Sequence, residues 1–309
     1  MNKFFRTSTF FNILIPLLLL TGCNASSIST KASSDGQNIS MAELESIINV
    51  PGPIKFEKHV AANWSINLSG LLNLEHPLAV KAGLQEKDEP IQLYVYSLSH
   101  PDRGTYLVDS GISERFNSPD ENPDLSFLVK MAMKTDKIQV IKTTQQLAKQ
   151  SAGGVSGVFL THIHMDHILG LTDLPKSTPV YTGPGEGSLS SAEHMFTQGT
   201  TDRLLANVQQ LREWQFDQNG IVDIFGDKSV FAIHSPGHSP GSTAYLVRST
   251  EGPQLLIGDA THTRWGWEHG VEPGTFSADP EKSVESLQRL IQLSESFPEI
   301  TVHPGHQSL

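Results

Sequence analysis

The stretch Thr161-His162-Ile163-His164-Met165-Asp166-His167 decides the fold of this chain. It directly follows a short apolar run that has the composition of a buried strand. Side chains alternate along an extended chain, so His162 and His164 point to the same side and can bind one metal ion. Where the chain then turns, Asp166 and His167 can reach a second ion. Imidazole nitrogens and carboxylates are ligands of zinc, so the stretch predicts two neighbouring metal sites.

Three further motifs supply candidate ligands at the ends of predicted strands. The motif Ser235-Pro236-Gly237-His238 follows an apolar run, and His238 lies in a turn rich in proline and glycine, which favours a ligand role. Asp259 is interpreted as a ligand that bridges two ions, the alternative being a carboxylate that only caps or turns the chain. His303 and His306 both follow the final predicted strand, and we expect one of them to bind metal.

The remaining pattern places strands and helices in alternation. We expect strands at 91–98, 105–108, 155–160, 179–182, 229–233, 242–247, 254–257 and 300–302, and helices at 143–151, 202–214 and 280–296. Alternating elements of this kind favour helices that cover packed sheets.

The first 22 residues are predicted to be an export signal. Lys3 and Arg6 precede the apolar stretch Phe10–Leu20, which is too short to cross a bilayer as a mature helix. The sequence Leu20-Thr21-Gly22-Cys23 resembles the lipobox of bacterial lipoproteins, so we expect a lipid on Cys23 and a place in the cell envelope. Asn24 favours the outer membrane, facing the periplasm. The alternatives are a secretory signal that ends near a cysteine by chance, and a buried thiol.

Residues 23–40 are predicted to form a flexible tether. Six serines and few apolar side chains lie between Asn24 and Ser40, which leaves little surface to bury. From Met41 onward the composition is that of a globular protein, so we expect one domain over residues 41–309. Cys23 is the only cysteine, which excludes a disulfide within the chain.

The charge of the chain excludes one class of partner. The formal net charge is −11, from 22 basic and 33 acidic residues. No basic run interrupts this balance, and an acidic surface repels phosphate backbones. We therefore expect no nucleic-acid partner.

These motifs, in this order from Asp109 to His306, resemble those of the metallo-β-lactamase superfamily. The resemblance implies an α+β fold, a four-layer αβ/βα sandwich, with the site at one edge of its two sheets. It implies one zinc ion on His162, His164 and His238 and a second on Asp166, His167 and His306, with Asp259 bridging. The Pro-Gly-His ending favours His306 over His303 as the last ligand. His303 and Asp109 are then expected to orient ligands.

The resemblance also implies hydrolysis. Two zinc ions would supply a hydroxide that attacks a carbonyl carbon, and Asp166 is the candidate catalytic residue that carries the proton. Asp259 favours lactone or ester hydrolysis, because β-lactamases generally have another residue there. A subclass B3-like β-lactamase is the alternative, since its Gly-His-Thr-Pro-Gly-Ser-Thr-Ala turn resembles residues 237–244. A lipid-anchored protein that binds metal without catalysis is a third interpretation.

Several aromatic and histidine side chains could contact a small-molecule substrate. Most of them follow Asp259 in a segment rich in aromatic residues and glycine, and each could equally be an ordinary core or loop residue. The candidates for the pocket wall are Tyr181, His262, Trp265, Trp267 and Phe276.

Overall fold

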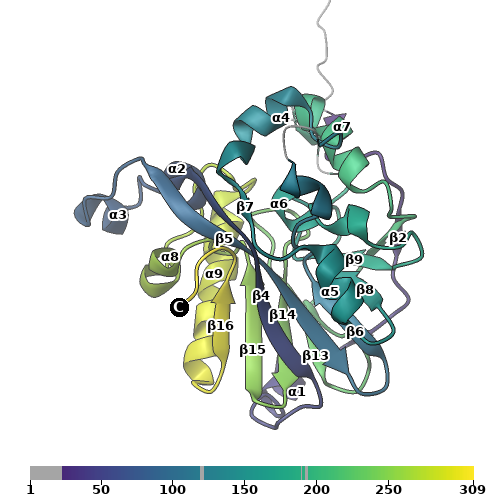
Figure 1. Cartoon of the computed structure of the whole chain (residues 1–309). Coiled ribbons are helices and arrows are strands. Elements are labelled where there is room, and N and C mark those ends of the chain that lie inside the picture. The colour runs from purple at the N-terminus through teal and green to yellow at the C-terminus, as the bar shows by residue number, and fades with distance from the viewer. Residues whose placement is uncertain (1–22, 119–121, 189, 192–193) are drawn as a thin grey trace, which may run out of the picture.

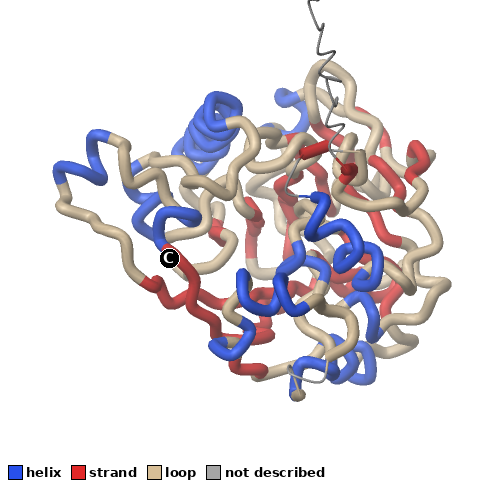
Figure 2. The backbone as a smooth tube through the Cα atoms, turned by 90° about the horizontal axis from the view of Figure 1, so that it is seen from above, coloured by secondary structure: helices blue, strands red, loops and turns tan. Residues whose placement is uncertain are grey.

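The computed structural model describes residues 23–309 except 119–121, 189 and 192–193. Two large sheets pack face to face, and helices lie outside them (Figure 1). Seen from above, strands run through the middle of the molecule and helices lie on its outside (Figure 2). This is the four-layer sandwich that the sequence predicts. The expected signal peptide, 1–22, lies outside the described residues. Within the described ranges, no helix has the length and apolar character needed to span a bilayer.

The first sheet has eight strands. In spatial order they are β2 (Thr30–Ala32), β11 (Leu211–Glu213), β9 (Val180–Thr182), β8 (Val155–Phe159), β6 (Gly104–Val108), β5 (Asp88–His100), β4 (Lys55–Asn67) and β7 (Gln139–Val140). The strands from β6 to β2 pair in parallel, so β6, β8 and β9 end at the same edge of the sheet. That edge carries the sequence that follows β8.

The second sheet has six strands. In spatial order they are β16 (Thr301–Pro304), β15 (Gly252–Gly258), β14 (Thr243–Ser249), β13 (Val230–His234), β12 (Ile221–Asp223) and β3 (Gln37–Asn38). Because β14 pairs antiparallel with both neighbours, β13 and β15 run in one direction, and β16 runs parallel to β15. Their carboxyl ends therefore meet at one edge. The Thr243 amide donates to the Thr161 carbonyl at 2.8 Å and joins this edge to the end of β8.

Three apolar cores hold the layers together. Phe159, Trp214 and Tyr245 fill the space between the sheets, each with at most 1% of its surface exposed. A second core covers the outer face of the eight-stranded sheet, and a third packs Leu290 and Leu293 of α9 against the outer face of the six-stranded sheet. Burial on both faces of the six-stranded sheet explains why β13 and β15 are mainly apolar.

The helices are short except for two. They are α1 (Met41–Glu45), α2 (Leu68–Leu71), α3 (Pro77–Lys81), α4 (Phe127–Ala132), α5 (Thr144–Gln150), α6 (Met165–Ile168), α7 (His194–Leu204), α8 (Arg264–His269) and α9 (Pro280–Ser296). The start of α9 is fixed by the Asp279 carboxylate, which accepts from the Lys282 amide, and by Pro280 at the first helical position.

The predicted flexible tether, 23–40, is wrong. Its residues form β1 (Cys23–Asn24), β2 and β3, which pair respectively with β10 (Ser190–Ser191), β11 and β12. Backbone pairing needs few apolar side chains, so composition alone did not reveal it. The segment joins both large sheets at their edges.

The predicted helix over 202–214 is also wrong beyond its first residues. Helix α7 ends at Leu204, and 211–213 form β11 between β9 and β2. The buried ring of Trp214 stacks on Tyr181 at 4.7 Å between centroids, which favours an extended chain beside β9. A segment this short has no periodicity that separates helix from strand.

Candidate metal centre

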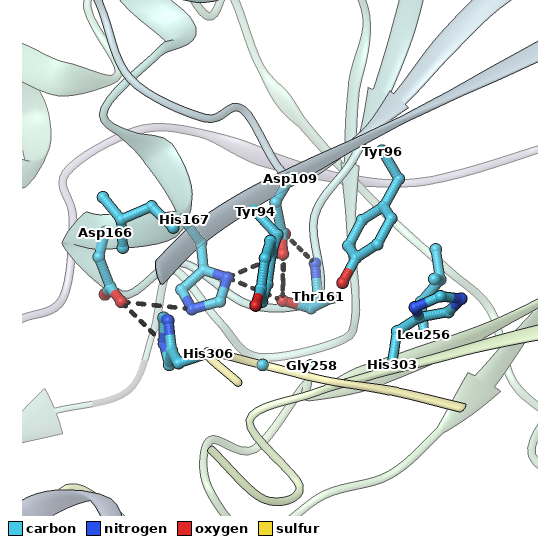
Figure 3. A pocket seen from close by; sticks show the side chains of 12 residues that line it. Tyr94, Tyr96, Asp109, Thr161, Asp166, His167, Leu256, Gly258, His303 and His306 are labelled. Carbon is cyan, nitrogen blue, oxygen red and sulfur yellow. Dashed lines mark hydrogen bonds and ion pairs between the residues drawn. The ribbon is translucent and has the colours of Figure 1, made fainter. Parts of the chain in front are cut away.

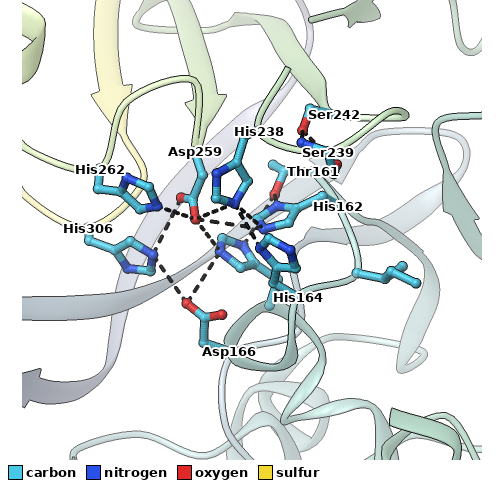
Figure 4. A network of polar contacts seen from close by, with 12 residues as sticks. Thr161, His162, His164, Asp166, His238, Ser239, Ser242, Asp259, His262 and His306 are labelled. Atoms are coloured by element: carbon cyan, nitrogen blue, oxygen red, sulfur yellow. Dashed lines mark hydrogen bonds and ion pairs between the residues drawn. The ribbon is translucent and has the colours of Figure 1, made fainter. Parts of the chain in front are cut away.

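Five segments bring the predicted ligands to one point (Figure 4). His162 and His164 follow β8, and Asp166 and His167 lie on α6, the short helix after them. The other three ligands follow the carboxyl ends of β13, β15 and β16. Their side chains are His238, Asp259 and His306, all at least 95% buried. The edge where parallel strands end therefore collects ligands from distant parts of the chain.

We call His162, His164 and His238 the histidine group. The Nε2 atom of His238 lies 3.1 Å from Nε2 of His162 and 2.8 Å from Nδ1 of His164. The three ligand atoms converge on one point, as a metal ion bound by three imidazoles requires.

We call Asp166, His167, His306 and Asp259 the carboxylate group. Nε2 of His306 lies 3.2 Å from Oδ2 of Asp166 and 3.4 Å from Oδ1 of Asp259. Nε2 of His167 lies 3.2 Å from Oδ2 of Asp259. The same Asp259 oxygen lies 3.5 Å from Nε2 of His238. Asp259 therefore stands between the two groups, in the position expected of a bridging ligand.

Hydrogen bonds fix the outer nitrogens of these rings. His306 Nδ1 donates to the Gln92 carbonyl at 3.0 Å, and His262 Nδ1 donates to the Leu71 carbonyl at 2.9 Å. His167 Nδ1 lies 2.8 Å from Asp109 Oδ2, and Asp109 also accepts from the amide and hydroxyl of Thr161 (Figure 3). Asp109 thus orients a predicted ligand, as expected of it.

The inner atoms fit bound cations. A ring that donates through Nδ1 has a lone pair on Nε2 when it is neutral, and this lone pair faces carboxylate oxygens at 3.1–3.4 Å for His262 and His306. Two electron-rich atoms this close repel each other unless a proton or metal ion lies between them. Oδ1 of Asp259 is moreover buried without a hydrogen bond. Divalent cations would satisfy these atoms, so the residues present fit a metal centre.

Charge separates the two groups in the metal-free protein. Burial lowers the pKa of His164 to about 4, and burial with neighbouring rings lowers the pKa of His162 and His238. Burial also opposes protonation of His306, but Asp259 and Asp166 outweigh it and raise its pKa to about 10. The histidine group is therefore neutral at pH 7, whereas His306 carries a proton that a metal ion would displace.

Close approach at the site requires glycine at 305. A Cβ atom at this position would lie 2.0 Å from Oδ1 of Asp259, so any other residue would push the carboxylate aside. Asp109 has φ of 57°, a left-handed conformation that is uncommon for a residue with a side chain. Backbone conformations of this kind concentrate at functional sites.

A cavity of about 460 Å³ opens onto both metal groups. Asp166, His238, Asp259 and His306 lie at its base, and its walls are mainly apolar. The apolar wall residues are Trp64, Ile66, Leu71, Ile91, Ala132, Met133, Met165 and Phe276. His262 and Phe276 line this cavity, as the sequence predicts.

The other three predicted wall residues lie elsewhere, and these predictions are wrong. Tyr181 is between the sheets in a different cavity, where its hydroxyl donates to Asp35 at 2.8 Å. Trp265 stacks on His269 along α8, and Trp267 packs against the core under α9. The sequence placed both tryptophans close to Asp259, but the helix turns them away from the cavity.

His303 and His306 have different surroundings. Only His306 belongs to a group of converging ligand atoms, whereas His303 Nε2 lies 2.9 Å from the Gln254 side chain. The His303 ring packs near Phe56 and Tyr96, away from Asp166 in Figure 3. The prediction that His303 orients a ligand is wrong, because its hydrogen bond reaches Gln254 instead.

Sequence reasoning missed Glu186. This buried carboxylate accepts from the amides of Ile163 and Gly241 at 2.9 and 2.7 Å and from the Ser239 hydroxyl at 2.5 Å. It therefore fixes the segment between His162 and His164 to the turn that carries His238. Burial raises its pKa. A lone glutamate in a glycine-rich loop gives no pattern that could have identified it.

Comparison with known proteins agrees with this geometry. The N-acyl homoserine lactonase AttM of Azorhizobium caulinodans is 34% identical over 145 residues, which cover 46% of this chain and 54% of AttM. AttM of Agrobacterium fabrum is 32% identical over 156 residues, covering 49% and 58%. The chain thus spans little more than half the length of these curated relatives.

A solved structure shows the same fold. The N-acyl homoserine lactone hydrolase with the product N-hexanoyl-L-homoserine at its catalytic metal centre superposes with a TM-score of 0.58 at 20% identity, covering 83% of this chain and 93% of the other. The family model described as the metallo-beta-lactamase superfamily matches residues 90–306, which contain all the ligands above. This chain is a member of the metallo-β-lactamase superfamily.

Proposed function

We propose that this protein is a dinuclear zinc hydrolase that opens lactones, with N-acyl homoserine lactones and related acyl lactones as its substrate class. The observation that carries the proposal is the position of Asp259. Its carboxylate faces both His238 of the histidine group and His167 of the carboxylate group, and it lines an apolar cavity. The two curated relatives described above are named as lactonases of this kind.

The donor set favours zinc over other cations. Five imidazoles and two carboxylates converge, with no thiolate among the ligands. Oxygen-only sites suit magnesium and calcium, whereas imidazole-rich sites suit zinc and its neighbours. Two such ions would polarise the substrate carbonyl and make a water molecule acidic enough to attack near neutral pH.

We infer that Asp166 carries the proton. Its side chain is 17% exposed, against 3% for Asp259, and it lines the cavity. Burial opposes its ionisation, but His167 and His306 outweigh burial and lower the pKa of Asp166. A carboxylate held ionised at this point can take a proton from the attacking water and return it to the leaving ring oxygen. Water adds to the carbonyl carbon, the ring C–O bond breaks, and a hydroxy acid leaves.

The cavity suits a substrate with an apolar tail. Trp64, Ile66 and Met133 offer hydrocarbon surface in the wall of this cavity. Burial of one methylene there contributes about 0.8 kcal/mol to binding. A lactone ring over the ligands would then leave its acyl chain against these side chains.

A substrate panel tests the proposal. The zinc-loaded full chain is assayed against N-acyl homoserine lactones of increasing chain length, simple aryl esters, thioesters and β-lactams, with metal content measured. We expect lactones to have the highest kcat/KM, and Asp166→Asn to lower kcat by a factor on the order of 100 or more. Faster β-lactam hydrolysis would favour the B3-like alternative, and a fully loaded chain without turnover would favour the non-catalytic one.

We also propose that Cys23 carries a lipid that anchors the protein to the bacterial cell envelope, at the outer membrane and facing the periplasm. The lipobox-like sequence that ends at Cys23 supports this proposal. Metabolic labelling with a fatty acid in a bacterial host tests it. We expect label on the wild-type chain and none on Cys23→Ser, and label on both would contradict the assignment of the modified residue.

A further inference from the structure

Four large apolar side chains are exposed together on α4 and α7. Phe127, Leu128 and Met131 of α4 are 73, 57 and 62% exposed, and Phe196 of α7 is 62% exposed. Side chains of this size seldom gather on the surface of a protein that contacts only water. We call these four side chains the apolar face.

The neighbouring structure holds the apolar face outward. Val129 and Met133 are buried on the inner side of α4, so residues 127, 128 and 131 lie on its outer side. The Ser126 side chain caps the helix by accepting from the Val129 amide. Arg203 of α7 donates through Nε to the Asp124 carbonyl at 2.9 Å, which joins α7 to the start of α4. The exposure is therefore built into the packing of the two helices.

The helices that carry the apolar face also line the cavity over the metal ligands. Ala132 and Met133 at the end of α4, and Thr197 on α7, line that cavity. The same two helices thus present one side to the cavity and the other to the exterior. A lipid surface against the apolar face would lie against the two helices that line the cavity.

The described chain begins at this face. Strand β1 starts at Cys23, pairs with β10 just before α7, and packs against α7 (Figure 1). In the sequence, the apolar stretch Phe10–Leu20 precedes Cys23, the residue at which β1 begins beside α7. A lipid or apolar segment at this end of the chain would draw the apolar face to a membrane.

We propose that the apolar face docks on a phospholipid bilayer and that the enzyme takes long-chain acyl substrates from the lipid. The substrate part rests on the proposed lactonase function, whereas the docking part does not. Zwitterionic headgroups suit this surface, because a chain of net charge −11 gains nothing from an anionic membrane. Phe, Leu and Met side chains enter the acyl boundary of a bilayer favourably.

Site-specific labelling tests docking without an activity assay. Cys23→Ser gives a full chain without cysteine, into which a single cysteine is placed by Phe127→Cys or Phe196→Cys and labelled with a polarity-sensitive fluorophore. Val80→Cys on α3 is the matched control, because Val80 is also apolar and 63% exposed. The probe membrane is a vesicle of phosphatidylethanolamine and phosphatidylcholine.

We expect the labels at 127 and 196 to shift to the blue when the protein sediments with vesicles, and the label at 80 to stay unchanged. Equal behaviour of all three labels on bound protein overturns the proposal, as does a failure to bind vesicles. Sedimentation equilibrium without lipid provides a second check. A dimer that Phe127→Ser dissociates would assign the apolar face to a second copy of this chain.

Kinetics test the source of the substrate. Vesicles sequester dodecanoyl homoserine lactone but leave butanoyl homoserine lactone in water. In the triple variant Phe127→Ser/Leu128→Ser/Met131→Ser, we expect added vesicles to lower the turnover of the dodecanoyl substrate roughly tenfold. The wild type should keep its dodecanoyl turnover when vesicles are added. Turnover of the butanoyl substrate should stay unchanged in both proteins. Equal inhibition of both proteins overturns uptake from lipid. If the wild-type protein hydrolyses no lactone but the labels at 127 and 196 still shift, the proposed function is wrong and the docking proposal is still supported.

Discussion

The histidine group and the carboxylate group adjoin each other but prepare for metal in different ways. Burial and ring–ring contacts keep the first group neutral, with the pKa of His164 lowered to about 4. The second group contains both carboxylates, which raise the pKa of His306 to about 10. One half of the site therefore offers free lone pairs, and the other must exchange a proton for a cation.

The difference identifies what each half contributes. Three neutral imidazoles bind a cation without cancelling its charge, so an ion there stays a strong electrophile. Two carboxylates would reduce the charge of a neighbouring ion, and Asp166 is the more exposed of the two in the cavity. Asp259 links the halves because its oxygens face both.

Substitution of Asp259 is expected to have the largest effect. Asp259→Asn removes the charge that both groups share and keeps the volume. We expect zinc content to fall from two ions to one or fewer, and kcat/KM to fall by about 1,000-fold or more. Metal analysis after gel filtration measures the first and lactone turnover the second.

Retention of two ions by Asp259→Asn would contradict the bridging role. Thr263→Ser serves as the control, because Thr263 is buried nearby and its hydroxyl only caps α8. This variant should keep both ions.

Paired variants can separate the two groups. We expect Asp166→Asn to lose the ion of the carboxylate group and His238→Asn to lose the ion of the histidine group, each leaving about one ion per chain. Both should lower kcat by a factor on the order of 100 or more. Cobalt substitution with absorption spectra distinguishes which site remains.

Identical cobalt spectra from the two variants would contradict the division into groups. If a variant keeps two ions and only its kcat falls, the substituted residue acts in catalysis and does not bind metal.

Glu186 offers a test of the support behind the histidine group. Glu186→Ala leaves two amides and a hydroxyl without their acceptor, and we expect the free energy of unfolding to fall by roughly 2–5 kcal/mol. Metal affinity of the histidine group should fall about 10- to 100-fold. Denaturant unfolding and competition with a chelator measure the two effects.

Glu186→Gln is the conservative control. Its amide oxygen can still accept from Ile163 or Gly241, so we expect it to recover much of the affinity. Equal metal affinities of Glu186→Ala and Glu186→Gln would show that Glu186 contributes packing only.

The pH dependence of metal binding is the smallest expected effect. In the metal-free protein the pKa of His306 is about 10, above the value of 6.5 for free histidine, so this ring is protonated at pH 7. Zinc must displace that proton, and affinity should rise about tenfold per pH unit for each proton displaced, up to about pH 10. Titration in weakly buffered solution would show proton release.

His306→Asn should remove part of that release, because Asp109 and Asp259 outweigh burial and raise the pKa of His167 as well. An equal loss of proton release in His164→Asn would contradict the contrast, because the pKa of His164 is already lowered to about 4 and its ring is neutral at pH 7.

Much of the fold and site was predictable because ligands follow strands. The strands before His162, His238 and Asp259 are buried apolar runs, and each ligand comes just after one. Parallel strands end at the same edge of a sheet, so a ligand that directly follows such a strand in the sequence lies at that edge. The Pro-Gly-His ending already favoured His306 over His303, and packing adds the reason, because His303 lies within β16 and contacts Gln254.

What could not be predicted depends on contacts between distant segments. The strands β2 and β3 contain ordinary polar residues, and only their pairing with β11 and β12 makes them strands. Tyr181 and Trp267 are aromatic residues of the kind that line pockets, but their side chains pack in apolar cores away from the cavity. Glu186 acts through backbone amides, which no side-chain pattern records.

The pairing of β2 with β11 also constrains the order of folding. Thr30 is among the first residues of the fold to be synthesised, but its partner Leu211 follows it about 180 residues later. At 5–20 residues per second, β2 therefore waits on the order of ten seconds or more for its neighbour. One edge of each large sheet can close only after most of the chain has emerged, so the nascent protein needs protection from aggregation during that interval.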